Sequence, residues 1–217
     1  VDRARTPTWR LVVAAQNHDQ IGNRAIGDRL TAHLDDGQLA IAAVLTTMSP
    51  FTPMLFMGEE WAASTPWQFF TSFADPVLGE ATATGRIAEF ARMGWDESAV
   101  PDPQDPATFA RSKLDWGEPE QPRHRRMLDT YRTLLAFRRE HADITDPSFL
   151  ATSCELDEAE RWFILHRGAI SVLVNFATDE RELAGDGRIL FVTDDAVRMA
   201  LGLVTLPAHS AVVLRRS

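Results

Sequence analysis

Two continuous apolar runs, each followed at once by a polar cluster, constrain the fold of this chain more than any other feature. Residues 11–15 (LVVAA) precede residues 16–20 (QNHDQ), and residues 54–57 (MLFM) precede residues 58–61 (GEEW). A strand without polar alternation is typically buried on both faces, as in a parallel sheet covered by helices. Residues 38–47, rich in Leu and Ala, are typical of a helix between the two strands. This order predicts a βαβ unit.

A long segment, from residue 62 to about residue 120, interrupts the regular pattern. We expect little regular structure in it beyond a short helix over residues 86–93, because prolines recur along it: Pro66, Pro76, Pro101, Pro103, Pro106 and Pro119. Segments of this length within a compact protein are usually functional. Residues 125–139 then predict a surface helix, whose apolar stripe consists of Leu128, Tyr131, Leu134 and Leu135.

The pattern changes after residue 147 to short β-rich runs. They cover residues 162–167, 170–176, 189–192, 201–206 and 211–214, with turn residues between them. This spacing is typical of an antiparallel sandwich. We therefore expect two domains, residues 1–147 and residues 148–217.

The composition narrows the class of partner. The chain has 22 Lys and Arg against 31 Asp and Glu, and this net charge of −9 argues against nucleic acid and anionic membranes as partners. The longest apolar run, residues 39–45, is far shorter than the ~20 residues of a spanning helix, so we expect no membrane segment. The single cysteine, Cys154, excludes an intramolecular disulfide and favours a reducing, cytoplasmic location. The start at Val1, without a methionine or a signal peptide, suggests part of a longer protein.

Acidic residues follow both predicted strands. Asp19 follows the first strand, and Glu59 and Glu60 follow the second. In an α/β barrel the carboxyl ends of the strands form the rim on which active sites lie. Carboxylates accept hydrogen bonds from sugar hydroxyls, and the nearby aromatic rings can cover the C–H faces of a sugar. The pattern therefore favours a carbohydrate site, with Asp19 beside a cationic transition state and His18 donating to the same sugar ring.

Each of these residues also has a structural interpretation. A His-Asp pair after a strand is most often a turn or a cap. Glu59 and Glu60 are consecutive, so in an extended segment at most one of them faces a site, while the other binds an arginine or is solvated. The aromatic residues could instead pack the long segment. The histidines show no ligand spacing, so we predict no metal site.

Four segments together resemble the α-amylase superfamily of glycoside hydrolases, and within it the malto-oligosyltrehalose trehalohydrolase family. They are residues 16–24 (QNHDQIGNR), 55–61 (LFMGEEW), 102–109 (DPQDPATF) and 112–116 (SKLDW). The first segment resembles the signature at the seventh strand of the superfamily's barrel. The other three select the family within it.

The resemblance implies that residues 1–147 carry strands seven and eight of a (β/α)8 barrel with their helices, and that residues 148–217 form the sandwich. It implies a retaining hydrolase that cleaves the α-1,4 bond next to the terminal trehalose unit of maltooligosyl trehalose and releases trehalose without a cofactor. Asp19 would be the transition-state stabiliser. Substrate-binding roles would fall on His18, Gln20, Ile21, Gly22, Asn23, Glu59, Glu60 and Trp61.

The resemblance also implies that an Asp nucleophile and a Glu acid/base belong to an upstream part of the same enzyme. Retention needs both carboxylates about 5 Å apart across the scissile bond. We therefore expect the 217-residue chain alone to be inactive and to depend on that upstream part. Two alternatives remain open, an α-glucan branching or debranching enzyme and a non-catalytic glucan-binding fragment.

Overall fold

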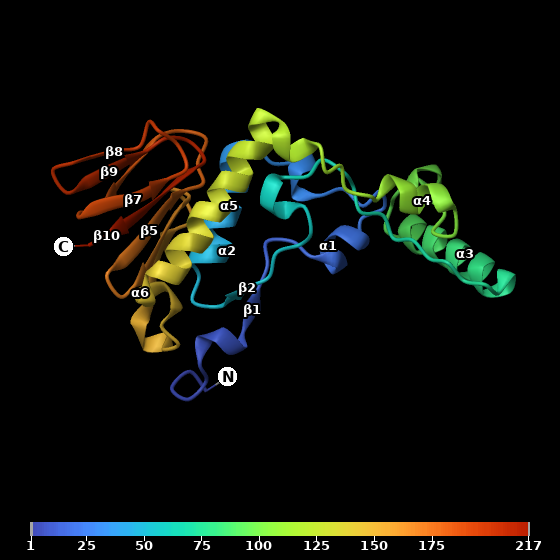
Figure 1. Ribbon diagram of the computed structural model, residues 1–217, viewed down its shortest axis with the longest axis horizontal. Helices are drawn as coiled ribbons and strands as arrows, with labels where there is room; N and C mark the ends of the chain where they lie inside the picture. Colours follow the sequence, from blue (N-terminus) through green and yellow to red (C-terminus); the bar gives the residue numbers. More distant parts are fainter. Residues whose placement is uncertain (1, 217) are drawn as a thin grey trace. The chain divides into compact units, whose positions relative to one another are not determined.

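A small parallel sheet forms within the first apolar run and just before the second. The computed structural model describes residues 2–216, and in it β1 (Val12–Val13) pairs with β2 (Thr52–Pro53) in parallel (Figure 1). The parallel order is confirmed, but the two strands are shorter than the apolar runs predict. Val12 is 61% exposed, and residues 54–57 follow the second strand as a loop. Among the described residues each of these strands pairs with one neighbour.

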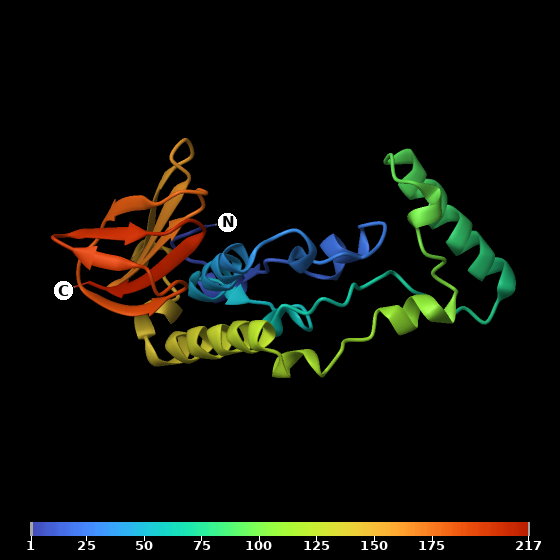
Figure 2. The same ribbon diagram turned by 90° about the horizontal axis from the view of Figure 1, so that it is seen from above.

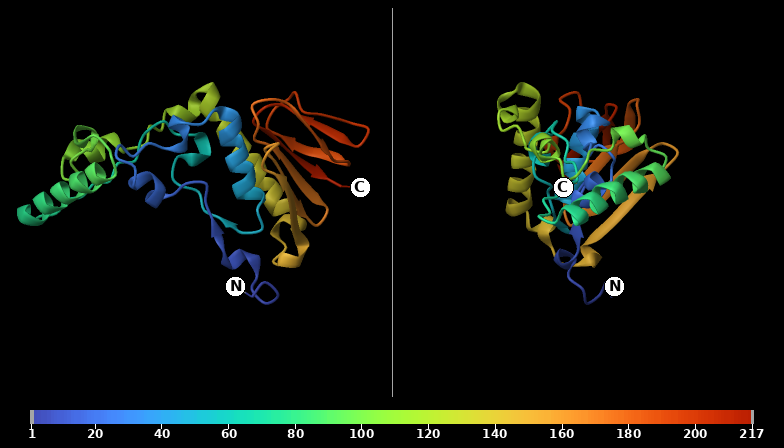
Figure 3. Two further views of the ribbon diagram at one scale, coloured as in Figure 1. Left: turned by 180° about the vertical axis from the view of Figure 1, so that it is seen from behind. Right: turned by 90° about the vertical axis from the view of Figure 1, so that its right-hand side faces the viewer.

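Helix α2 (Asp36–Met48) lies between these strands in the sequence, as predicted. Its N-terminus is a capping box, because the Asp35 carboxylate accepts from the Gln38 backbone N–H at 2.8 Å and the Gln38 side chain accepts from the Asp35 N–H at 3.1 Å. The predicted surface helix is α5 (Pro122–Glu140), which buries Tyr131 and Leu134. Helices α2 and α5 lie side by side, and both the left view of Figure 3 and Figure 2 show this pairing.

Two antiparallel sheets form the C-terminal part of the chain (Figure 2). The larger sheet has the order β3-β4-β5-β10-β7, and the smaller one has the order β6-β9-β8. The strands are β3 (Thr152–Asp157), β4 (Trp162–Arg167), β5 (Ile170–Asn175), β6 (Arg181–Ala184), β7 (Arg188–Val192), β8 (Arg198–Ala200), β9 (Leu203–Leu206) and β10 (Ser210–Arg215). All five predicted runs contain a strand, whereas β3, β6 and β8 were not predicted.

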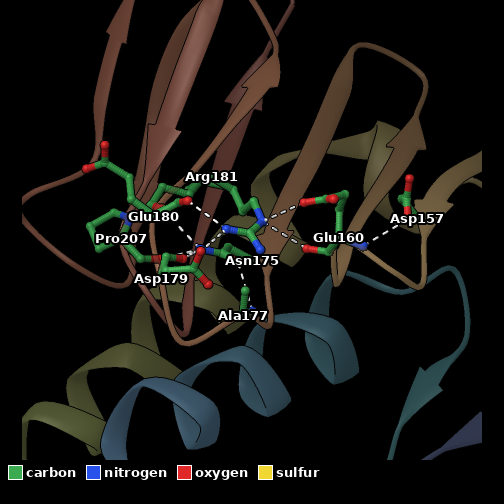
Figure 4. Close-up of polar contacts among 9 residues, drawn as sticks. Asp157, Glu160, Asn175, Ala177, Asp179, Glu180, Arg181 and Pro207 are labelled. Carbon is green, nitrogen blue, oxygen red and sulfur yellow. Dashed lines mark hydrogen bonds and ion pairs between the residues drawn. The ribbon is translucent and has the colours of Figure 1, made fainter.

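The sandwich core lies between the two sheets. Both sheets contribute buried side chains to it: Ile164, Leu173, Leu183, Val204, Leu206, Val212 and Leu214. One edge of the core is closed by polar groups (Figure 4). The fully buried Asn175 donates to the carbonyls of Asp179 and Pro207 at 2.8 Å each and accepts from the Ala177 N–H at 2.8 Å. Beside it, Arg181 forms an ion pair with Asp179 and donates to the Glu160 carbonyl at 3.0 Å. These contacts join the end of β5 to the turns around it.

The long middle segment is more regular than its prolines predict. Helix α3 (Pro76–Arg92) covers the predicted helix at 86–93 but begins ten residues earlier, and helix α4 (Pro106–Arg111) follows. Both helices begin at an Asp-Pro pair in which the aspartate caps the first turn, Asp75 to the Val77 N–H and Asp105 to the Ala107 N–H, each at 2.9 Å. The expectation of irregular chain was wrong because proline at the first helical position costs no hydrogen bond.

The remaining elements are short. They include the helices α1 (His18–Gly22) and α6 (Ala142–Thr145). Single turns of 3-10 helix occur at Thr8–Arg10, Leu30–Ala32, Glu59–Trp61, Glu97–Ala99, Glu118–Glu120 and Phe149–Ala151. The chain forms two compact units, one with residues up to 15, 34–54 and 126 onwards, and one with residues 16–33 and 55–125. Among residues 2–216 no helix combines the length and the apolar character that a membrane crossing requires.

Candidate functional site

Helix α1 presents the His-Asp pair to solvent. The Asn17 carboxamide oxygen accepts from the Asp19 N–H at 2.7 Å, and the Gln20 side-chain oxygen accepts from the Asn17 N–H at 3.0 Å. This double cap uses the side-chain oxygens of Asn17 and Gln20. The side chains of His18 and Asp19 are 65% and 69% exposed, with Nε2 and Oδ1 3.2 Å apart. Asp19 is therefore not the capping residue, and its carboxylate is accessible to a ligand.

The opposite side of α1 is a packing surface. Ile21 and Gly22, both predicted to bind substrate, are buried, whereas Asn23 is exposed. Trp67 lies against Gly22 so closely that a Cβ there would be 2.8 Å from the indole ring. Trp67 also donates its backbone N–H to the Gly27 carbonyl at 2.8 Å. The segment around Trp67 therefore supports the loop that carries Asp19.

The second acidic cluster is a tight turn and not an extended segment. Gly58 has φ +84°, and Glu59–Trp61 form a 3-10 turn. Glu59 and Glu60 therefore do not alternate between two faces as they would in an extended strand. Glu59 is 6% exposed, and its carboxylate accepts from the Phe56 N–H at 3.1 Å. Glu60 is only partly buried. Of the two carboxylates, Glu60 is the more accessible.

Trp61 anchors this turn from within. It is 3% exposed, its indole N–H donates to Glu118 Oε2 at 3.1 Å, and its carbonyl lies 2.8 Å from His124 Nδ1. Glu118 also accepts from the Ser64 N–H at 3.1 Å. Trp116 packs against Trp61 in a tilted arrangement, with a centroid distance of 5.1 Å and an interplanar angle of 45°, and is itself 74% exposed. The indole ring that a ligand could contact at the surface is therefore that of Trp116, because the Trp61 ring is buried and its N–H is already bonded to Glu118.

Arg29, which the sequence patterns did not single out, joins the two clusters. Its Nε donates to the Thr65 carbonyl at 2.6 Å and its Nη1 donates to the Met57 carbonyl at 2.8 Å. The side chain is 2% exposed, and burial lowers the pKa of Arg29, while the charges of Glu118, Glu59 and Glu60 oppose that shift. The loop that follows Asp19 is thus bonded to both flanks of the Glu59–Glu60 turn.

A second charged group stabilises the same loop. The Asp28 carboxylate is 8% exposed, pairs with Arg24 Nη2 at 2.6 Å and contacts the His33 imidazole. Burial alone would raise the pKa of Asp28, but the hydrogen bonds from Arg24 and His33 outweigh it and hold that pKa below its usual range. Within residues 2–216, no cluster of three or more His, Cys, Asp or Glu side chains could hold a metal ion.

Comparison with known proteins agrees with these motifs. Residues 147–213 match a family described as a domain of unknown function, DUF3459. Over 94% of its length the chain is 56% identical to the malto-oligosyltrehalose trehalohydrolase of Rhizobium sp. (strain M-11). Over 99% of its length it is 41% identical to the protein of the same name from Mycobacterium tuberculosis. The chain is related to the malto-oligosyltrehalose trehalohydrolases.

The chain spans about a third of these trehalohydrolases, 35% of the Rhizobium protein and 37% of the Mycobacterium protein. A crystal structure of a putative α-amylase from Salmonella typhimurium is similar in fold, with a TM-score of 0.82 and 31% identity over 99% of this chain and 36% of that one. The resemblance to the trehalohydrolases and to α-amylase family structures, predicted from the four motifs, is thereby confirmed.

Proposed function

We propose that this chain is the C-terminal part of a retaining glycoside hydrolase that releases trehalose from maltooligosyl trehalose. The observation that carries the proposal is the exposed Asp19 carboxylate within a chain 56% identical to a trehalohydrolase. In this reading, residues 1–147 contribute the last two strands of a (β/α)8 barrel and residues 148–217 form a separate sandwich domain. The parallel pairing of β1 and β2 around α2 and the start of the family match at residue 147 support that division.

The proposed role of Asp19 follows from the charge of the transition state. Glycosidic cleavage develops positive charge at the anomeric carbon, and a fixed anion beside it lowers the barrier. Asp19 is held by the backbone of a capped turn, so little reorganisation is needed when the charge develops. Removal of one preorganised group of this kind costs roughly 3 kcal/mol of transition-state stabilisation. The nucleophile and the general acid/base come from an upstream part of the enzyme, so the 217-residue chain alone is inactive.

The predicted substrate-binding residues divide into two groups by exposure. His18, Gln20 and Asn23 are exposed and Glu60 is partly so, and we assign contacts with sugar hydroxyls to them. The other four residues are buried and shape the backbone beneath the substrate: Ile21, Gly22, Glu59 and Trp61. The substrate is an uncharged α-glucan, and no cofactor takes part.

The test is product analysis with the full-length protein that contains this chain. Maltooligosyl trehalose is incubated with the wild type, with Asp19→Asn and with the control Asp195→Asn, which removes an exposed carboxylate from the turn before β8. We expect free trehalose from the wild type and the control, and turnover roughly 100-fold lower for Asp19→Asn. New α-1,6 branches would instead indicate a branching enzyme, and glucan binding without any product would indicate a binding fragment. Normal turnover of Asp19→Asn would remove Asp19 from its role.

A further inference from the structure

An arginine from the long middle segment reaches the short helix that carries Asp19. Arg86, in the second half of α3, donates through Nη2 to the carbonyl of Gly22, the last residue of α1. Its guanidinium carbon lies 4.4 Å from the ring centroid of Phe69 and 4.7 Å from that of Phe90. Burial lowers the pKa of Arg86, and the charge of Glu89 opposes the shift. The cation is therefore held by two aromatic rings while it binds one carbonyl.

Helix α1 cannot fix its own position. It has five residues, far fewer than the ~12–15 that an isolated helix needs for even marginal stability in water. The Asn17–Gln20 capping box holds its first turn. At its other end the Asn23 N–H donates to the Asp19 carbonyl at 3.0 Å and the Arg24 N–H donates to the Ile21 carbonyl at 3.1 Å. The Gly22 carbonyl, at the negative end of the helix dipole, accepts from Arg86. Arg86 therefore adds a charged donor at the Gly22 carbonyl and ties that end of α1 to a residue 64 positions away in the sequence.

We propose that Arg86 is a positioning residue that holds α1, and with it the Asp19 carboxylate, in the place where the reaction needs it. This inference rests on the proposed function. Gly22 is three residues from Asp19, and the two lie within one turn of the same helix, so a displacement of the Gly22 carbonyl moves the Asp19 backbone with it. The Trp67 ring packs against Gly22 on another side. Misplacing a reacting group by about 1 Å can cost 10²-fold in rate.

The experiment compares three variants of the full-length protein. Arg86→Met removes the charge and the donors but keeps an apolar stem between the rings. Arg86→Lys keeps a cation but loses the planar fork. Arg92→Met removes an exposed arginine from the same helix and is the matched control. Hydrogen exchange of the peptide covering residues 17–28, together with kcat and KM for trehalose release, is measured for each.

We expect exchange at residues 17–28 to be at least tenfold faster in Arg86→Met and kcat to fall about 10- to 100-fold, with KM changed by less than about threefold. For Arg86→Lys, the exchange rate and kcat should lie between those of Arg86→Met and the wild type. For Arg92→Met, both should equal the wild-type values. If Arg86→Met does not fold, Arg86→Lys decides the question by the same two readouts. Wild-type exchange and kcat in the substituted proteins, or a lower melting temperature with normal kcat, would overturn the proposal. If the wild type releases no trehalose, the proposed function fails, while the exchange data still support or overturn the hold of Arg86 on α1.

Discussion

Arg138 provides a sharp test of how α2 and α5 are held together. It lies in the last turn of α5 and donates to three carbonyls at the end of α2, those of Thr47 at 2.7 Å, Ser49 at 2.7 Å and Phe51 at 2.6 Å. Carbonyls at a helix C-terminus have no partner within the helix. Thr47 and Ser49 are buried, so water cannot easily replace the guanidinium. The substitution Arg138→Met therefore removes the bonds without emptying the space.

The size of the effect follows from these contacts. A hydrogen bond to a charged group contributes about 1.5–3 kcal/mol net, so three independent bonds would contribute roughly 5–9 kcal/mol. The three bonds share one guanidinium, and desolvation of that cation costs several kcal/mol, as the burial-lowered pKa of Arg138 indicates. We therefore expect Arg138→Met to destabilise this unit by about 2–4 kcal/mol. Arg139→Met, at the neighbouring exposed position, should change its stability by less than about 0.5 kcal/mol.

Native-state hydrogen exchange of α2 and α5 peptides in the full-length protein is the appropriate assay, because it reports local opening free energies without requiring two-state unfolding of the whole chain. Since 1.4 kcal/mol corresponds to a factor of ten, Arg138→Met should accelerate exchange there about 30- to 700-fold. Peptides from α3, in the other compact unit, serve as an internal control. Equal exchange rates in Arg138→Met and Arg139→Met would refute the reasoning, because they would show that the three carbonyls find other partners.

Two further predictions concern stability. Leu134→Ala, at a fully buried position of α5, should cost about 2–5 kcal/mol in thermal or urea unfolding, and an unchanged melting temperature would show that the helix packs differently. Asp28→Asn tests pH dependence. Because the pKa of Asp28 is lowered in the folded protein, its stabilising charge is complete at neutral pH and is lost as the pH falls through that lowered pKa. Urea unfolding should show a deficit for Asp28→Asn of about 1.5–3 kcal/mol at pH 7 that shrinks towards pH 2, and a pH-independent deficit would contradict this account.

Helices and strands that carry a capping residue or an apolar run in their own sequence could be predicted, and those without such a feature could not. Helix α2 has its capping aspartate and strands β4 and β5 have their apolar runs, so all three were located. Strand β3 is an edge strand with mostly exposed residues, so its pattern lacks the apolar alternation that predicts a strand. The prediction for helix α3 was too short at its N-terminus, because Pro76 was interpreted as a helix breaker. Together with the capping residue Asp75 it instead starts the helix.

The candidate site divides in the same way. The motif at residues 16–24 identified Asp19, and the structure shows its carboxylate exposed on a capped turn, although its proposed role stays a prediction. Arg29 and Arg86 could not have been found, because each binds a backbone carbonyl distant in sequence, 28 residues away for Arg29 to Met57 and 64 residues away for Arg86 to Gly22. A carbonyl is present at every position, so such a contact leaves no signal in the residue types of its acceptor.

The same chemistry recurs at several buried or partly buried arginines, which bind backbone carbonyls in loops or near the ends of helices: Arg29, Arg86, Arg138, Arg167 and Arg181. A planar guanidinium with five donors can bind several carbonyls at once, whereas a lysine ammonium cannot present the same fork. Three buried carboxylates, Asp28, Glu59 and Glu118, offset these cations, so the net charge of −9 lies mainly on the exterior. Such a surface repels polyanions but exerts no net force on an uncharged sugar. The use of arginine inside the protein and the neutral substrate that we propose are therefore compatible.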